Sequence, residues 1–166
     1  MYVKKALWIM VREGFVKLGK DEIVNEKVID IVGDVKKVSI TTPKNMGESL
    51  GIQMHWLGIV FKALGKRFLV GAQVLDNTHK KRLFRFDSGC RRYKVTSILT
   101  ILPLAMKDDW NCLEIDLRKQ LQRFYGTDFV EIIRIEVQGS CRLRRIFTSY
   151  DSLADINMPF DIRLLK

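Results

Sequence analysis

Residues 67–86 read RFLVGAQVLDNTHKKRLFRF, and this stretch decides the fold class. Every second residue over 68–74 is apolar, which is the pattern of an extended strand that turns one face toward a core. Asp76 and Asn77 then supply side chains that favour a turn, and a second alternating run follows over 80–86. The stretch therefore predicts a β-hairpin with one buried face.

The same period of two recurs along the chain. Three further segments alternate apolar and polar side chains, 113–117, 133–137 and 160–164. Each predicts a half-buried strand, and Ile133 and Ile135 are expected in the core. Residues 57–64 and 95–102 are instead apolar at both parities, which predicts strands covered on both faces in the middle of a sandwich. Pro103 is expected to end the second of these.

One segment breaks the β pattern. Leu117, Leu121 and Phe124 lie at helical spacing. Gly126 follows at the position of a C-terminal cap, so we predict one short helix over 118–125. Many short strands with a single helix are typical of a mainly β protein, a β-sandwich or jelly roll, and not of a βαβ fold.

The chain of 166 residues has the length and hydrophobic content, 47%, of one domain, so residues 1–166 are expected to form a single β-sandwich domain. Residues 1–21 are its least regular part, because apolar positions in residues 3–10 fit a helix face whereas Gly14 and Gly19 favour turns. No apolar run approaches the ~20 residues of a membrane span, and no secretory signal opens the chain. We expect a cytosolic protein without membrane contact.

The search for catalytic chemistry returns little. The phosphate-loop, dinucleotide-loop and HExxH zinc-protease patterns are absent from the sequence. Asp108 and Asp109 form an acidic pair, but adjacent acids before a tryptophan more often make a solvated turn. Cys90, Cys112 and Cys141 lack CxxC spacing and a locally placed histidine, so reduced, structural thiols are expected. We therefore predict a non-catalytic protein with no catalytic residues, no metal and no cofactor.

Positive charge is the feature that stands out. Lys and Arg outnumber Asp and Glu by 29 to 19, which attracts acidic partners. The candidate partner-binding residues are the clustered cations Lys80, Lys81, Arg82, Arg85, Arg91, Arg92, Lys94, Arg142, Arg144 and Arg145. If their segments lie side by side they form one basic surface, in which arginines can grip carboxylates with paired hydrogen bonds. The alternative is a solvated strand edge whose charges prevent aggregation.

Two other classes of function stay open at this point. Phe84, Phe86 and Tyr93 lie among the basic residues, as in a nucleic-acid-binding β-domain whose aromatic rings stack on bases. Phe84 and Phe86 share one strand parity, however, which is simpler to explain as core packing, and no RNP1 signature is present. A glycan-binding module or lapsed enzyme would need a row of exposed aromatics, whereas the three tryptophans are scattered.

Six short blocks follow one another along the chain: Leu50-Gly51-Ile52, Gln73-Val74-Leu75-Asp76, residues 82–85, Asp108-Asp109-Trp110-Asn111, Tyr125-Gly126-Thr127-Asp128 and residues 141–145. In this order they resemble the cilia- and flagella-associated protein twenty family. The resemblance runs from Val28 to the C-terminus and is densest between Lys66 and Ile146. Residues 1–21 diverge, and a glycine that family members usually carry before the tryptophan is missing.

The resemblance implies a jelly-roll-like antiparallel β-sandwich that works in the axoneme and basal body of cilia and flagella. It further implies partners at the inner junction of doublet microtubules: tubulin of the A- and B-tubule protofilaments, the Parkin co-regulated gene product and other microtubule inner proteins. The family's contact residues are not carried over, so the ten cations above rest on charge alone. We expect reversal of Arg142, Arg144 and Arg145 to glutamate to weaken tubulin association and to leave the fold intact.

Overall fold

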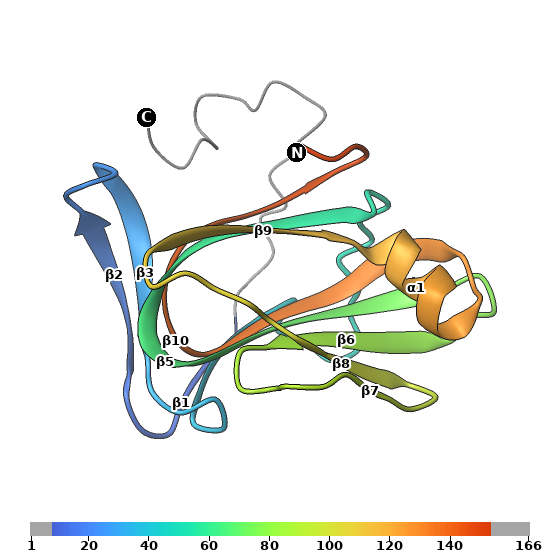
Figure 1. Ribbon diagram of the computed structural model, residues 1–166, viewed down its shortest axis with the longest axis horizontal. Helices are drawn as coiled ribbons and strands as arrows, with labels where there is room; N and C mark the ends of the chain where they lie inside the picture. The colour runs from blue at the N-terminus through green and yellow to red at the C-terminus, as the bar shows by residue number, and fades with distance from the viewer. Residues whose placement is uncertain (1–7, 154–166) are drawn as a thin grey trace.

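The computed structural model describes residues 8–153, which form ten β-strands and one α-helix (Figure 1). The elements in chain order are β1 (Trp8–Val11), β2 (Phe15–Asp21), β3 (Glu26–Val32), β4 (Val38–Thr42), β5 (Trp56–Asp76), β6 (Lys81–Asp87), β7 (Lys94–Val95), β8 (Leu99–Pro103), β9 (Trp110–Asp116), α1 (Leu117–Tyr125) and β10 (Phe129–Ser149). The mainly β fold with one short helix is confirmed.

Two long strands organise the molecule. β5 and β10 have 21 residues each and pair antiparallel along their whole length, from Phe129 opposite Asp76 to Ser149 opposite Trp56. The register breaks between Gly139 and Cys141, where β10 bends. Because both strands bend, their two halves lie in different layers of a sandwich (Figure 1).

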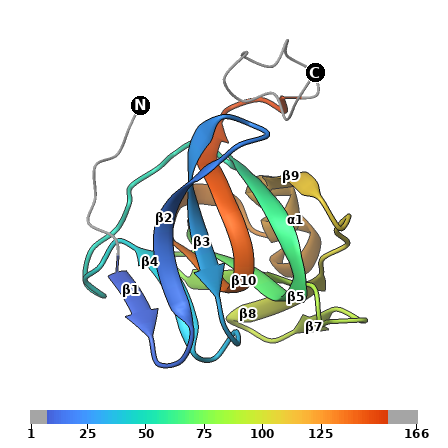
Figure 2. The same cartoon turned by 90° about the vertical axis from the view of Figure 1, so that its left-hand side faces the viewer.

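The other strands extend each layer. We name the two layers after β6 and β9. In the β6 layer, the first half of β10 pairs with the second half of β5. The sheet continues from β10 through β4 to β1, and from β5 through β6 and β8 to β7. In the β9 layer, the second half of β10 pairs with β3, which pairs with β2, and the first half of β5 pairs with β9. All pairs are antiparallel except β6 with β8, which are parallel. The β2–β3 hairpin forms one end of the molecule (Figure 2).

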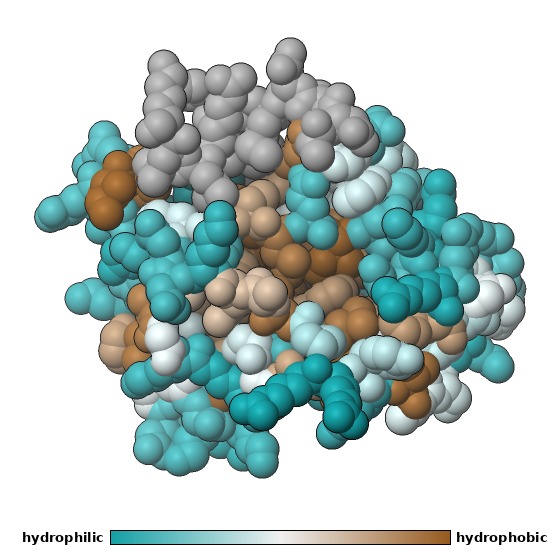
Figure 3. All heavy atoms as spheres, viewed as in Figure 1, coloured by the Kyte–Doolittle hydropathy of each residue, from teal (hydrophilic) through white to brown (hydrophobic). Residues whose placement is uncertain are grey.

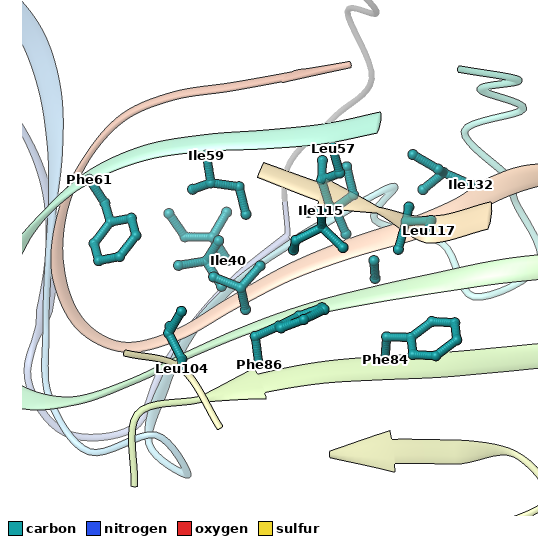
Figure 4. Close-up of a cluster of buried hydrophobic side chains, with 14 of the residues drawn as sticks. Ile40, Leu57, Ile59, Phe61, Phe84, Phe86, Leu104, Ile115, Leu117 and Ile132 are labelled. Carbon is teal, nitrogen blue, oxygen red and sulfur yellow. The ribbon is translucent and has the colours of Figure 1, made fainter. Parts of the chain in front are cut away.

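The core lies between the two layers (Figure 4). Leu57, Ile59 and Ile115 of the β9 layer face Phe84 and Phe86 of the β6 layer, and all five side chains are buried. Burial of a large aliphatic or aromatic side chain stabilises a fold by about 1.5–3 kcal/mol, so this cluster is the main source of stability. The rings of Phe61 and Phe68 meet at 4.5 Å between centroids, where β5 turns from one layer to the other.

The predicted hairpin over 67–86 is confirmed, with alternate residues over 68–74 in the core. Asp76 holds its turn, because one carboxylate oxygen accepts hydrogen bonds from the N–H groups of Thr78 and Lys80. The predicted core position of Ile135 is confirmed too. Ile133 is buried as predicted, and its neighbour Ile132 is buried in the main core cluster, next to a register irregularity between Ile132 and Arg134.

The predicted helix is confirmed and begins one residue earlier, at Leu117. Asp116 caps its N-terminus by accepting a hydrogen bond from the N–H of Lys119. Gly126 ends it in the left-handed conformation, with φ of 63°, and donates to the carbonyl of Gln122. Within the described residues, no helix has the length and apolarity of a membrane span.

The prediction of a buried strand over 95–102 is wrong in part. Val95 ends β7 and Leu99 begins β8, and Val95 and Ile98 are exposed. These two short strands form a hairpin at the edge of the β6 layer. Of the two, β8 contributes side chains to the core and β7 does not. Pro103 does end β8 as predicted. At the N-terminus, the described part begins as strand β1, and the predicted strand over 160–164 lies outside the described residues.

Candidate partner-binding surface

The candidate cations do not form one surface. Arg85 lies on β6 and pairs across β5 with the first half of β10. Arg142 lies on the second half of β10, between Asp30 of β3 and Lys62 of β5. The bend at Gly139 separates the two groups, because it carries the end of β10 into the other layer. The period of two in the sequence cannot reveal such a bend.

Arg142 is held by two carboxylates. Its Nη1 donates to Asp21 at 2.5 Å, and its Nε donates to Asp30 at 2.7 Å. Burial alone would raise the pKa of Asp21, but hydrogen bonds from Arg142 and from the N–H groups of Val24 and Ile23 hold that pKa below its usual value. The hydrogen bonds to Asp30 and Asp21 raise the pKa of Arg142. This arginine therefore ties β10 to the β2–β3 hairpin.

Arg144 and Arg145 share a second carboxylate. Arg144 donates from Nε and Nη2 to the two oxygens of Glu26, both at 2.8 Å, and Arg145 lies 3.7 Å from the same group. The hydrogen bonds from Arg144 lower the pKa of Glu26. Reversing these arginines would place carboxylates against Asp21 and Glu26, so the structure revises the expectation that such a variant keeps its fold.

Arg82 and Arg85 are engaged within the β6 layer as well. The side chain of Arg82 is 8% exposed, donates to Asp76 at 2.9 Å and stacks on the ring of Tyr125. Arg85 donates to Glu136 at 2.8 Å across the sheet. Both arginines therefore serve sheet structure, and their charges are neutralised by neighbouring carboxylates.

The other five candidates face solvent. Lys80 and Lys81 lie at the β5–β6 turn, Arg91 and Arg92 in the loop after β6, and Lys94 on β7. All five are exposed, and within residues 8–153 they have no recorded salt bridge. The β5–β6 turn and β7 lie toward the end of the sandwich that carries α1 (Figure 1). Among the ten candidates, these five therefore keep an exposed charge.

A groove of about 590 Å³ lies on the outer face of the β6 layer. Its polar lining includes Gln73, Arg85, Arg134 and Glu136. The charged groups satisfy one another or the backbone: Arg85 pairs with Glu136, and Arg134 donates to the carbonyls of Pro43 and Asn45. Arg134 is buried under the loop that it holds.

One hydrolase-type pattern escaped the motif search. Residues 47–51 read GESLG and match the GxSxG of a nucleophile elbow. The elbow requires a strand-to-helix turn, but these residues lie in the loop between β4 and β5. The hydroxyl of Ser49 donates to Glu131 at 2.7 Å and accepts from the N–H of Gly51. The local structure is thus a loop anchored to β10, and the pattern does not mark a nucleophile elbow.

The cysteines behave as apolar residues. Cys141 is fully buried, and burial raises the pKa of its thiol. Burial also raises the pKa of Cys112. A raised pKa disfavours the thiolate, which is the nucleophilic form. In the part of the chain that the structure describes, no three His, Cys, Asp or Glu side chains gather as metal ligands.

We expect stability to fall in acid. The pKa values of Asp21 and Glu26 are lowered in the fold, so each contributes stability above its unfolded pKa of about 4 and loses it as pH falls toward the folded value. Urea unfolding between about pH 6 and pH 3 should show this decline. In the Arg142→Ala variant, the free energy of unfolding should fall less steeply with decreasing pH, because Asp21 then lacks the hydrogen bond from Arg142 that lowers its pKa. An equal slope in both proteins would contradict this assignment.

Comparisons with known proteins identify the family of this chain. The CFA20 domain matches residues 4–166. The chain is 30% identical over 155 residues to cilia- and flagella-associated protein 20 of Chlamydomonas reinhardtii, covering 93% of this chain and 82% of that protein. It is 29% identical to the protein of that name from Paramecium tetraurelia and 28% to that from Caenorhabditis elegans, covering 81% and 76% of them. Because the domain match spans nearly its whole length, the chain belongs to the CFA20 domain family.

Proposed function

We propose that this chain is a structural protein of the ciliary and flagellar axoneme. It binds tubulin and neighbouring proteins at the inner junction of doublet microtubules, stabilises the doublet and supports motility. The observation that carries this proposal is membership of the CFA20 domain family, together with relatives named for cilia and flagella. Neighbours at the junction would include the Parkin co-regulated gene product, and the basal body is a further location.

The physical properties of the fold support this role. Tubulin is acidic, so exposed and unpaired cations on a basic protein favour binding. A contact that is weak at each site persists when it repeats along a polymer. The two-layer core and the arginine pairs of β10 make the sandwich rigid, which suits a protein that carries load between microtubule walls.

Tubulin contact is proposed for the five exposed cations, Lys80, Lys81, Arg91, Arg92 and Lys94. The other five candidates hold the fold together through internal carboxylates. A partner would have to displace those carboxylates before it could use them. Each such exchange leaves an acidic group unpaired and so adds little net affinity.

Co-sedimentation tests the proposal directly. We expect the purified protein to pellet with microtubules at low salt and to dissociate progressively as salt rises, because screening weakens attraction between exposed charges. Actin filaments, which are also acidic polymers, serve as the control and should retain less protein. Absence of pelleting with microtubules at low salt would contradict tubulin binding.

A tagged copy in a ciliated cell tests the location. We expect the signal along the axoneme, retained after detergent removes the ciliary membrane. A signal spread through the cell without regard to cilia would exclude the axonemal role, even if the protein bound microtubules in vitro.

A further inference from the structure

Helix α1 is fixed against the edge of the β6 layer by Tyr125. The hydroxyl of Tyr125 lies 2.7 Å from that of Thr100 on β8, and its ring packs edge-on against Phe84 of β6 at 6.0 Å. The guanidinium of Arg82 covers the same ring at 4.3 Å. The helix therefore has a defined position against β6 and β8.

The loop before β7 meets the helix through two aromatic rings. Tyr93 is 61% exposed, and its ring centroid lies 5.9 Å from that of Phe124. The guanidinium of Arg123 stacks on the other ring at 4.9 Å. Lys119 lies one helical turn before Arg123 on the same face. We call this continuous patch the loop–helix surface, formed by Arg91, Arg92, Tyr93, Lys94, Lys119 and Arg123.

The charge of this surface is unbalanced. Residues 88–99 and 117–127 contain six Lys and Arg residues and no Asp or Glu. The cations of the loop–helix surface have no recorded salt bridge within residues 8–153, in contrast to Arg142. The end of the molecule that carries α1 is mostly hydrophilic on the face shown in Figure 3. An uncompensated cluster of this kind lowers stability through self-repulsion unless an anionic partner binds.

The helix itself shows the same bias. Its first turn has no acidic residue and carries Arg118 and Lys119. Acidic residues at this end stabilise a helix by about 0.3–1 kcal/mol, because they complement its positive N-terminal dipole. The carboxylate of the N-cap residue Asp116 offsets part of this effect, so Arg118 and Lys119 add exposed positive charge to this end of the helix.

We propose that the loop–helix surface is the docking site for a glutamate-rich, extended segment of a protein partner. Arginine side chains can bind carboxylates through paired hydrogen bonds. Tyr93, which lies between Arg92 and Lys94 in the chain, offers an exposed ring. Val95 and Ile98 are exposed beside the cations, at 42% and 64%. β7 is the last strand of its layer, so an extended chain can also pair along its edge. The apolar side chains and the strand edge favour a polypeptide over a nucleic acid.

The segment that this proposal commits to is the glutamate-rich tail of tubulin, and in that respect it rests on the proposed function. The proposal deepens that function, because it assigns the contact to the β7 loop and α1 and excludes the arginines of β10. It also adds Lys119 and Arg123, which are not among the ten candidate cations, and Tyr93, which the sequence offered only as a ring that could stack on bases. Their signal was present in the acid-free run of residues 117–127, but only the ring contact with Phe124 joins it to the loop.

The test uses a fluorescent peptide of ten glutamates and the full chain, with binding measured by fluorescence anisotropy. Arg91→Glu/Arg92→Glu/Lys94→Glu is expected to weaken binding about tenfold or more, because attraction becomes repulsion. Lys20→Glu/Lys27→Glu/Lys36→Glu is the matched control, since it makes the same change in net charge at exposed positions elsewhere. The Lys119→Ala/Arg123→Ala variant should also weaken binding of the peptide. This variant leaves the loop residues unchanged, so it tests the contribution of the helix.

Intact microtubules and microtubules without tubulin tails complete the test. We expect tail removal to weaken pelleting of the wild type and to have little effect on the loop variant. Equal loss in the loop variant and its control would overturn the proposed surface, as would tighter binding of single-stranded RNA than of the peptide. If the wild type pellets to the same extent with tail-less microtubules as with intact ones, this inference fails and the proposed function stands. If it binds the peptide but no microtubules, the proposed function fails instead.

Discussion

Gly139→Ala is expected to lower the free energy of unfolding by about 3 kcal/mol or more. Gly139 lies where β10 bends between the two layers, with φ of 87°. A Cβ atom at this position would lie 2.3 Å from the backbone carbonyl oxygen of Arg67 and 2.7 Å from Val35. The variant thus combines backbone strain with a clash against main chain that cannot rotate away. Urea unfolding followed by circular dichroism measures the change.

Gly65→Ala is the matched control for this prediction. Gly65 lies on β5 at the same corner and also has a positive φ, 67°, but an added Cβ atom would meet nothing within 4 Å. Its replacement should cost only the backbone strain, about 1 kcal/mol. If the two variants lose equal stability, the close approach of Arg67 to Gly139 does not constrain the bend.

Arg142→Ala is expected to destabilise the fold by about 2–3 kcal/mol. Asp21 is 2% exposed and loses the guanidinium that neutralises it, and Asp30 loses two hydrogen bonds. The loss should detach the β2–β3 hairpin first, because Arg142 is the side chain that ties Asp21 of β2 and Asp30 of β3 to β10. Hydrogen exchange of the β2 and β3 amides, together with urea unfolding, measures both effects.

Two further variants make the Arg142 prediction specific. Arg142→Lys should recover only part of the lost stability, because one ammonium group cannot reproduce the fork that reaches both carboxylates. Lys20→Ala, at an exposed position on the same hairpin, should change stability by less than about 0.5 kcal/mol. Full recovery by lysine would mean that charge alone, without geometry, holds the hairpin.

The internal ion pairs also change how the basic character of this protein is understood. The formal charge of +10 describes the whole chain. Half of the ten candidate cations are nevertheless bound by carboxylates on other strands, and these pairs add rigidity rather than affinity. The exposed remainder lies at the β5–β6 turn, in the loop after β6 and on β7.

Local patterns predicted the local structure well. The hairpin over 67–86, the helix before Gly126 and the strand end at Pro103 all follow from contacts between residues near in sequence. Ile133 is buried as its alternation predicts, but the burial of its neighbours Ile132 and Arg134 does not follow from a period of two, because the strand register is irregular there. The strand over 95–102 was wrong in part, because an apolar run looks the same in a covered strand and at an exposed edge.

The amino-acid sequence by itself determined the mainly β class, the place of the helix and the excess of positive charge, since periodicity, capping residues and composition act over a few residues. Only the tertiary structure decided which cations meet carboxylates and which meet solvent. Arg142 and Asp21 are separated by 121 positions and meet only because β10 bends at Gly139 and β3 lies beside its second half. Whether a charge is neutralised depends on distances of a few ångströms between strands, and sequence spacing does not specify those distances.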